Sequence, residues 1–75
     1  MSKSTMSAVD IRCFRWKLGL KANELGVLLG VTGPAVEHWE SGRRKVSGIA
    51  VTLIRLMKAH PELIDEVKKW NLGDQ

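Results

Sequence analysis

Apolar residues recur along the chain at the three- and four-residue spacing of amphipathic α-helices. Leu25, Leu28 and Leu29 share one helical face, and Val36 and Trp39 share another beyond an interruption by glycine. No segment alternates apolar and polar residues as a strand would. The same spacing predicts five helices, over about residues 7–17, 22–29, 33–40, 48–59 and 61–70. The predicted fold class is therefore all-α, with five short helices around one core.

Turn and cap residues separate these predicted helices. Ser7, with Asp10 three residues later, is typical of a capping box. Gly30 adopts positive φ without steric cost, and Thr32 can cap the helix that follows it. The two helices joined there predict a helix-turn-helix, an arrangement that lets one helix enter a DNA groove. Gly26, inside the first of these two helices, is expected to lie where two helices approach closely.

A chain of 75 residues has room for one core. We expect a single domain over residues 7–70, a disordered tail at residues 1–6 and a frayed tail at residues 71–75. A domain of this size buries only about 60% of its unfolded surface, so it is marginal without further support. Cys13 is the only cysteine, which excludes an internal disulfide and a cysteine-rich zinc module. Dense helix packing or oligomerisation is left to supply the stability.

Charge is distributed unevenly around the predicted turn. The formal net charge is +4, with +3 over residues 1–20, −2 over residues 21–42 and +3 over residues 43–45. Positive charge thus flanks residues 33–40 on both sides, which suits a protein that contacts phosphates on either side of a groove. A solvated basic loop is the simpler alternative for residues 43–45.

Few residues are suited to catalysis or to metal binding. His38 and His60 have no second ligand at metal spacing, and Cys13 is interpreted as a small, partly buried apolar residue. We therefore expect no enzymatic activity, no cofactor and no metal. The aromatic platforms of a small RNA-binding domain are missing too. The first seven residues are not a signal peptide and no apolar run can span a bilayer, so a soluble cytoplasmic protein is expected.

Four short motifs surround the predicted turn: Leu18-Gly19-Leu20, Glu24-Leu25, Leu29-Gly30-Val31-Thr32 and Trp39-Glu40-Ser41-Gly42. Together they resemble the Cro/C1-type (XRE) helix-turn-helix family of transcriptional regulators over about residues 7–70. Further motifs are similar to the antitoxin-type branch of that family: Val46-Ser47-Gly48, Leu53-Ile54-Arg55-Leu56 and His60-Pro61-Glu62-Leu63. The resemblance implies a five-helix, lambda-repressor-like domain. Members of that branch repress their own operons and often partner a small toxin.

The resemblance also implies which residues face DNA bases: Thr32, Gly33, Pro34, Glu37 and His38. This chain departs from the usual pattern, because Gly33 and Pro34 have no side-chain donors with which to read purines. Pro34 can pack on a thymine methyl, Glu37 can accept from a cytosine amino group, and His38 can donate to guanine or a phosphate. Glu37 can equally repel the backbone, and His38 can be an exposed residue with no role. DNA shape is therefore expected to add to specificity.

Contacts to the DNA backbone are expected from basic and amide side chains: Lys21, Asn23, Arg15, Arg43, Arg44 and Lys45. Asn23 is expected to substitute for a glutamine that family members carry at the position of Ala22. By the same resemblance Arg15 pairs with Glu40, which joins the first helix to the third and can aim the guanidinium at a phosphate. Trp39 is interpreted as a core residue rather than as a base-stacking one.

The last two predicted helices carry more apolar residues than one stripe needs. In residues 48–59 the predicted core stripe is Ile49, Leu53, Leu56 and Met57, with Val51 and Ile54 turned away from it. In residues 61–70 the stripe is Leu63, Val67 and Trp70. The candidates for a dimer face are Val51, Ile54, Leu63, Ile64 and Trp70. Alternatively, these helices only complete one core.

We therefore expect a sequence-specific DNA-binding repressor that inserts residues 33–40 into the major groove of an operator. A single module with few base contacts binds weakly, so a homodimer on a two-fold operator is expected. The alternative is an antitoxin that neutralises a toxin by protein contact and represses its own operon. The expected partners are double-stranded DNA, a second copy of the chain and, in the alternative, a toxin protein.

Overall fold

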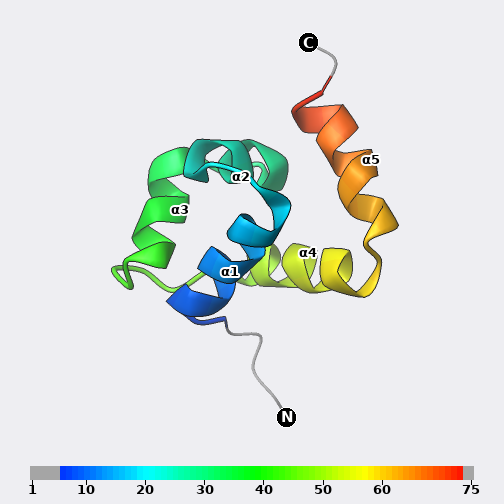
Figure 1. Ribbon diagram of the computed structural model, residues 1–75. Helices are drawn as coiled ribbons and strands as arrows, with labels where there is room; N and C mark the ends of the chain where they lie inside the picture. The colour runs from blue at the N-terminus through cyan, green and yellow to red at the C-terminus, as the bar shows by residue number, and fades with distance from the viewer. Residues whose placement is uncertain (1–5, 74–75) are drawn as a thin grey trace.

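Five α-helices make up the protein in a computed structural model that describes residues 6–73 (Figure 1). The helices are α1 (Ala8–Leu18), α2 (Ala22–Leu29), α3 (Gly33–Glu40), α4 (Gly48–Ala59) and α5 (Glu62–Asn71). No strand occurs in these described residues. The predicted all-α fold class is confirmed, and each helix begins and ends within a residue or two of its predicted limits.

Local capping explains why the helices begin and end at these residues. The hydroxyls of Ser7, Thr32 and Ser47 each accept a backbone N–H from three residues further on, at the starts of α1, α3 and α4. Gly30 ends α2 with a φ of 78°, in the left-handed region that favours glycine. The chain can therefore turn at once into α3, as the helix-turn-helix pattern predicts.

At the start of α1, Ser7 and Asp10 form the predicted capping box. Each residue donates its backbone N–H to the other's side chain at 3.1 Å. The backbone N–H of Ser7, and then its side chain, hold the pKa of the Asp10 carboxyl below its ordinary value of 3.8. The ionised carboxylate therefore stabilises the folded state above that value, and the contribution is lost as the pH falls through the lowered folded-state pKa.

Asp10→Asn is accordingly expected to lower the free energy of unfolding near neutral pH. The difference from the parent should shrink as both proteins are taken well below about pH 3.8, where the parent's carboxylate becomes protonated as well. Urea denaturation followed by circular dichroism over this pH range measures the difference. A difference that stays constant with pH would show that the charge of Asp10 contributes nothing.

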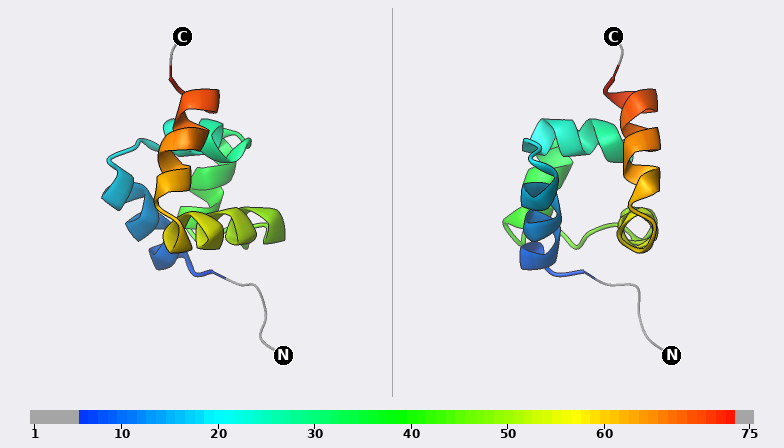
Figure 2. Two further views of the ribbon diagram at one scale, coloured as in Figure 1. Left: turned by 90° about the vertical axis from the view of Figure 1, so that its right-hand side faces the viewer. Right: turned by 45° about the vertical axis from the view of Figure 1, so that its right-hand side comes forward.

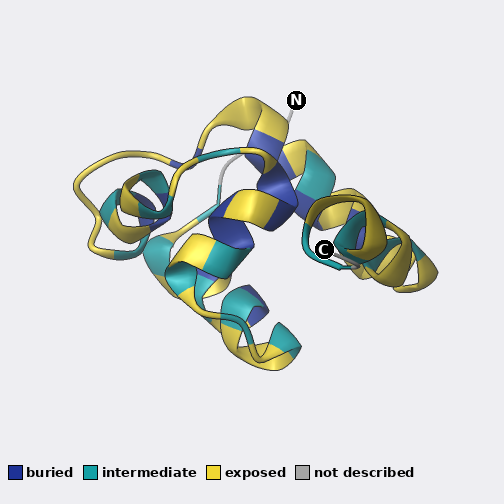
Figure 3. Cartoon of the chain, turned by 90° about the horizontal axis from the view of Figure 1, so that it is seen from above, coloured by how far each residue is buried: buried dark blue, intermediate teal, exposed yellow. Residues whose placement is uncertain are grey.

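The core lies where the first four helices meet, as the buried positions in Figure 3 show. Its buried apolar residues come from α1 to α4 and from the loop before α4: Ile11, Phe14, Leu25, Leu28, Leu29, Val36, Trp39, Val46, Ala50, Val51, Ile54 and Met57. Trp39 is therefore a core residue, as predicted. In contrast, α5 has no buried residue, and its Ile64 and Val67 only cover the edge of the core.

In α4 the predicted core stripe is right for Met57, which is buried, and for Leu53, which packs against the core, but wrong for Ile49 and Leu56. Val51 and Ile54, expected to point away from the core, are fully buried, while Ile49 is 71% exposed and Leu56 is 46% exposed. The apolar residues cover more than half of this helix, so periodicity alone allows two overlapping stripes. Packing selects the stripe that continues from the buried Val46 in the preceding loop. Val51 and Ile54 therefore cannot belong to a dimer face.

Both ends of the folded region differ slightly from prediction. Met6 is partly buried against the core, and the rest of the predicted disordered tail at residues 1–6 lies outside the described residues. Asn71, placed by prediction in a frayed tail, is the last residue of α5. Its side-chain amide donates to the Leu28 carbonyl at 3.0 Å and so joins α5 to the end of α2. Residues 74–75 lie outside the described residues.

The turn between α2 and α3 is packed tightly against Gly26. A Cβ atom at this position would lie 2.8 Å from the Val31 carbonyl oxygen and 2.9 Å from the Thr32 carbonyl carbon. The close approach predicted for Gly26 is present, but the neighbour is the backbone of the turn rather than another helix. Because backbone atoms cannot rotate away as a side chain can, a large residue here must open the turn.

Gly26→Val is therefore expected to destabilise the fold by about 2–3 kcal/mol, the cost of overpacking a tight contact. Gly48→Val is the matched control, because it also places valine in a helix but a Cβ there meets nothing within 4 Å. Thermal and urea denaturation of the two variants measure the difference. Equal stability of the variants would contradict a sterically closed turn.

Candidate nucleic-acid interface

The outer face of α3 is open to solvent. Thr32, Pro34 and Glu37 are exposed, and Gly33 and His38 have intermediate exposure, whereas Val36 and Trp39 on the opposite face are buried. In Figures 1 and 2, α3 and α5 lie on opposite sides of the molecule. No described part of the chain covers the face of α3 that the resemblance assigned to the bases.

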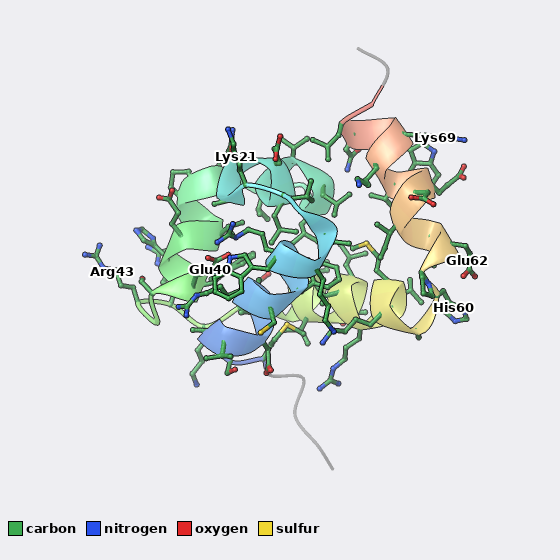
Figure 4. All side chains as sticks on the ribbon, viewed as in Figure 1. Lys21, Glu40, Arg43, His60, Glu62 and Lys69 are labelled. Atoms are coloured by element: carbon green, nitrogen blue, oxygen red, sulfur yellow. The ribbon has the colours of Figure 1, made fainter. Side chains whose placement is uncertain are left out.

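The first turn of α2 lies directly beside the first turn of α3. A Cβ atom at Gly33 would stand 3.1 Å from both Cα and Cβ of Asn23. Lys21 and Asn23 are exposed, and the Lys21 side chain points outward in Figure 4. Two helix N-termini, which both favour negative charge, are thus brought together with a lysine and an amide. This arrangement suits a phosphate next to the base-facing helix.

A basic loop extends from the other end of α3. The backbone N–H groups of Arg43 and Arg44 both donate to the His38 carbonyl, at 2.9 and 3.2 Å, so the loop is folded against the last turn of α3. The side chains of Arg43, Arg44 and Lys45 are exposed, and Arg43 points away from the molecule in Figure 4. Exposed positive charge therefore stands at both ends of the open face.

Arg15 and Glu40 form the ion pair that the resemblance implied. Arg15 donates from Nε to Glu40 Oε2 at 2.6 Å and from Nη2 to Oε1 at 2.9 Å, and its Nη1 donates to the Leu20 carbonyl at 3.1 Å. The side chains are only 19% and 11% exposed. The hydrogen bonds to Glu40 raise the pKa of the Arg15 guanidinium above its ordinary value. The pair fastens α1 to the end of α3, and most of the guanidinium is occupied by partners within the protein.

Arg12 was not singled out from the sequence, although it supports the same end of α3. Its Nη2 donates to the Glu40 carbonyl oxygen at 2.6 Å, a carbonyl that has no partner within the helix. Arg12 and Arg15 are three residues apart on α1, so they reach α3 from one face. That spacing is the signal that could have identified Arg12.

Among the described residues, the side chains that could bind a metal ion do not form a cluster. Within residues 6–73, no three histidine, cysteine or acidic residues gather where they could hold a metal ion. Cys13, predicted to be partly buried, is exposed, because it lies on the face of α1 opposite Ile11 and Phe14. His60 and Glu62 form only an exposed pair at 3.5 Å. Among the described helices none is long and apolar enough to cross a membrane.

An exposed helix after a tight glycine turn, held by a core tryptophan and a partly buried ion pair, defines a helix-turn-helix protein. A family model described as the antitoxin component of the bacterial toxin–antitoxin system, MqsA, matches residues 1–68. The chain belongs to this family, and it is an antitoxin-like member of the XRE-type helix-turn-helix regulators that the sequence motifs indicated.

Curated relatives agree with this assignment. The uncharacterized HTH-type transcriptional regulator YiaG of Escherichia coli (strain K12) is 36% identical over 63 residues, which are 84% of this chain and 66% of that protein. Antitoxin HigA-2 of Vibrio cholerae serotype O1 is 31% identical over 62 residues, which are 83% of this chain and 60% of that protein. The chain thus spans less than two thirds of each relative. Relatives with these names point to a non-enzymatic role.

Proposed function

We propose that the protein is a sequence-specific DNA-binding repressor that inserts α3 into the major groove of its operator. The observation that carries this proposal is the open face of α3, with exposed basic residues at both of its ends. An α-helix fits the major groove of B-form DNA, where the base edges can be read. The proposed mechanism is steric, since a protein bound at the operator blocks polymerase. Such a protein acts in the cytoplasm, on the nucleoid.

In this proposal, contacts to the DNA phosphates come from the side chains that are exposed around this face: Lys21, Asn23, Arg43, Arg44 and Lys45. Arg15 is assigned a positioning role, because three of its donors are already bonded to Glu40 and Leu20. The positive charge of the phosphate-contacting residues supplies most of the affinity and makes it depend on salt. These contacts carry no sequence information themselves but fix the register of α3 in the groove.

Base contacts are few in this proposal. Glu37 is exposed and can accept from a cytosine amino group, and Pro34 is exposed and can pack on a thymine methyl. His38 is half-buried, so its reach is shorter, and Gly33 has no side chain. Because two or three base contacts give limited discrimination, we propose that two copies bind a two-fold operator and that DNA shape adds to specificity.

An antitoxin function is the second candidate, and it uses the same fold. It is favoured by apolar residues that are exposed away from α3, among them Val9 at 59% and Trp16 at 62% on the outer face of α1. Exposed apolar surface of this kind is typical of protein contacts. In this proposal the chain neutralises a toxin through such a surface and represses the operon that encodes both proteins.

Selection of bound duplexes from a random DNA pool tests the proposal. The expected result is an enriched palindromic site that contains the bases Glu37 and Pro34 can read. Glu37→Ala should change the base preference within each half-site while leaving binding to random DNA nearly unchanged. Recovery of unenriched DNA, or of single-stranded RNA in a parallel selection, would overturn the proposed function.

A further inference from the structure

A pocket opens where the end of α1, the end of α4 and the start of α5 meet. Its volume is about 270 Å³, and five apolar residues from these segments line it: Phe14, Leu18, Met57, Pro61 and Ile64. In Figure 1, α5 rises from the end of α4 towards α2, and the pocket lies on the side of α5 that faces α1. Lys17 and Lys58 line the pocket as well, and we call it the two-lysine pocket.

The inner surface of the two-lysine pocket is apolar. Phe14 and Met57 are only 3% and 2% exposed, so they form its floor, and Leu18 and Ile64 are partly buried against the same core. A polar ligand group placed against these side chains would gain no hydrogen bond from them, and burying a polar group without a partner is costly. The inner part of the pocket therefore suits hydrocarbon.

The rim of the two-lysine pocket carries two positive charges. Lys17 and Lys58 are exposed, and each stands in the last turn of its helix. Within residues 6–73 neither ammonium group forms an ion pair. Asp10 attracts Lys58 through space, but its carboxylate already accepts the backbone N–H of Ser7 at 3.1 Å. Two lysines at the mouth of an apolar pocket favour a ligand with an anionic end.

We infer that the two-lysine pocket binds a small amphipathic carboxylate, with its hydrocarbon part against Phe14 and Met57 and its carboxylate beside Lys17 and Lys58. Small-molecule sites are mostly apolar, with a few charged groups that orient the ligand, and span roughly 300–1,000 Å³. At about 270 Å³ the pocket suits a short acid rather than a drug-sized molecule. Its lining residues belong neither to α3 nor to the basic loop, so the inference does not depend on the proposed function.

A second apolar cavity beside α5 provides a comparison within the same chain. Its volume is about 220 Å³, and it is lined by Leu56 together with Leu63 and Trp70, two of the residues predicted for a dimer face. Among the residues that the structure describes, the charged one that lines it is Glu66. Because this carboxylate repels another, an acidic ligand should choose between two apolar cavities of similar size by their charge.

An NMR titration of the ¹⁵N-labelled full chain with octanoate, without DNA, tests the inference, and the neutral octanamide is the matched ligand. We expect sub-millimolar binding of octanoate, amide shifts centred on Lys17, Leu18, Lys58 and Ile64, and weaker binding of octanamide. From butanoate to octanoate, each buried methylene should tighten binding by about threefold to fourfold. No binding of octanoate at millimolar concentration, equal affinities for acid and amide, or an affinity independent of chain length would overturn the inference.

A double variant tests the role of the two lysines. Lys17→Met with Lys58→Met removes both charges but keeps most of each apolar stem, so octanoate should bind about fivefold more weakly and octanamide as it binds the parent. Lys68→Met with Lys69→Met is the matched control, because it removes the same charge from the last turn of α5, outside the pocket. This control should bind octanoate as the parent does.

The melting temperatures of both double variants are measured without ligand, because a lysine in a last helical turn also offsets the partial negative charge of the helix end. An effect of this kind should be similar in the two variants, whereas the loss of octanoate binding should not. An equal loss of binding in both would mean that net charge alone attracts the acid. Shifts centred on Leu56 and Trp70 would mean that it enters the second cavity, and either result would contradict the assignment.

Discussion

Changing Arg43 and Arg44 together to alanine is expected to weaken DNA binding by about tenfold or more at low salt, on operator and random duplexes alike. Both side chains are exposed in the loop that is folded against the end of α3. Each lost phosphate contact should also reduce the salt dependence of binding by roughly one ion, so the slope should fall by about two. Fluorescence anisotropy at several salt concentrations measures both quantities.

The matched control for that double variant is Arg55→Ala with Lys58→Ala. It removes the same charge from exposed positions on α4, away from α3. The reduced net charge is expected to cause a small loss of affinity that is the same on all duplexes. The slope of affinity against salt concentration should not change. If the two double variants lose affinity equally, the basic loop acts only through net charge, and the assignment of Arg43 and Arg44 to phosphates is wrong.

Arg15→Met is expected to cause the largest loss of stability, about 3 kcal/mol or more. The change leaves the Glu40 carboxylate, only 11% exposed, without its cation, and an unpaired buried charge typically costs about 3–5 kcal/mol. For a domain of this size the melting temperature should fall by about 12 °C or more. Because the free energy of unfolding of a small domain is only modest, a substantial unfolded fraction of the variant is expected near physiological temperature.

A double variant separates the ion pair from the packing of the two side chains. Arg15→Met combined with Glu40→Met removes both charges, so it should be clearly more stable than Arg15→Met alone. The hydrogen bond from Arg12 goes to the Glu40 backbone carbonyl and remains possible in both variants. If the double variant is as unstable as the single one, the loss is due to packing and not to an unpaired carboxylate.

Much of the fold could be predicted from the sequence because its local signals are strong. Ser7, Thr32 and Ser47 cap helices that begin where the hydroxyl residues predicted them. Gly30 marks the end of α2, because few other residues adopt positive φ there at low cost. Such signals act within four residues along the chain, so they do not depend on how the helices pack.

What the sequence did not predict depends on packing between distant segments. The predicted rotation of α4 about its axis differs from the structure, because the apolar residues of this helix fit two stripes. Only packing against the other helices determines that Val51 and Ile54 are the buried ones. The hydrogen bonds of Arg12 and Asn71 span 28 and 43 residues. The spacing from Arg15 places Arg12 on the face of α1 towards α3 but does not indicate its carbonyl partner, and Asn71 carries no local signal at all. The base-facing and phosphate-contacting roles around α3 stay predictions until DNA binding is measured.

The most direct test of DNA reading by α3 is an NMR titration of the ¹⁵N-labelled protein with the selected duplex. The account predicts that the largest amide shifts fall on Thr32, Glu37 and His38. Large shifts are also expected at the start of α2 and in the loop over residues 43–45. Amides in the middle of α5 should change little at a protein concentration where the oligomeric state is constant. Shifts confined to α4 and α5, with an unperturbed α3, would contradict the account.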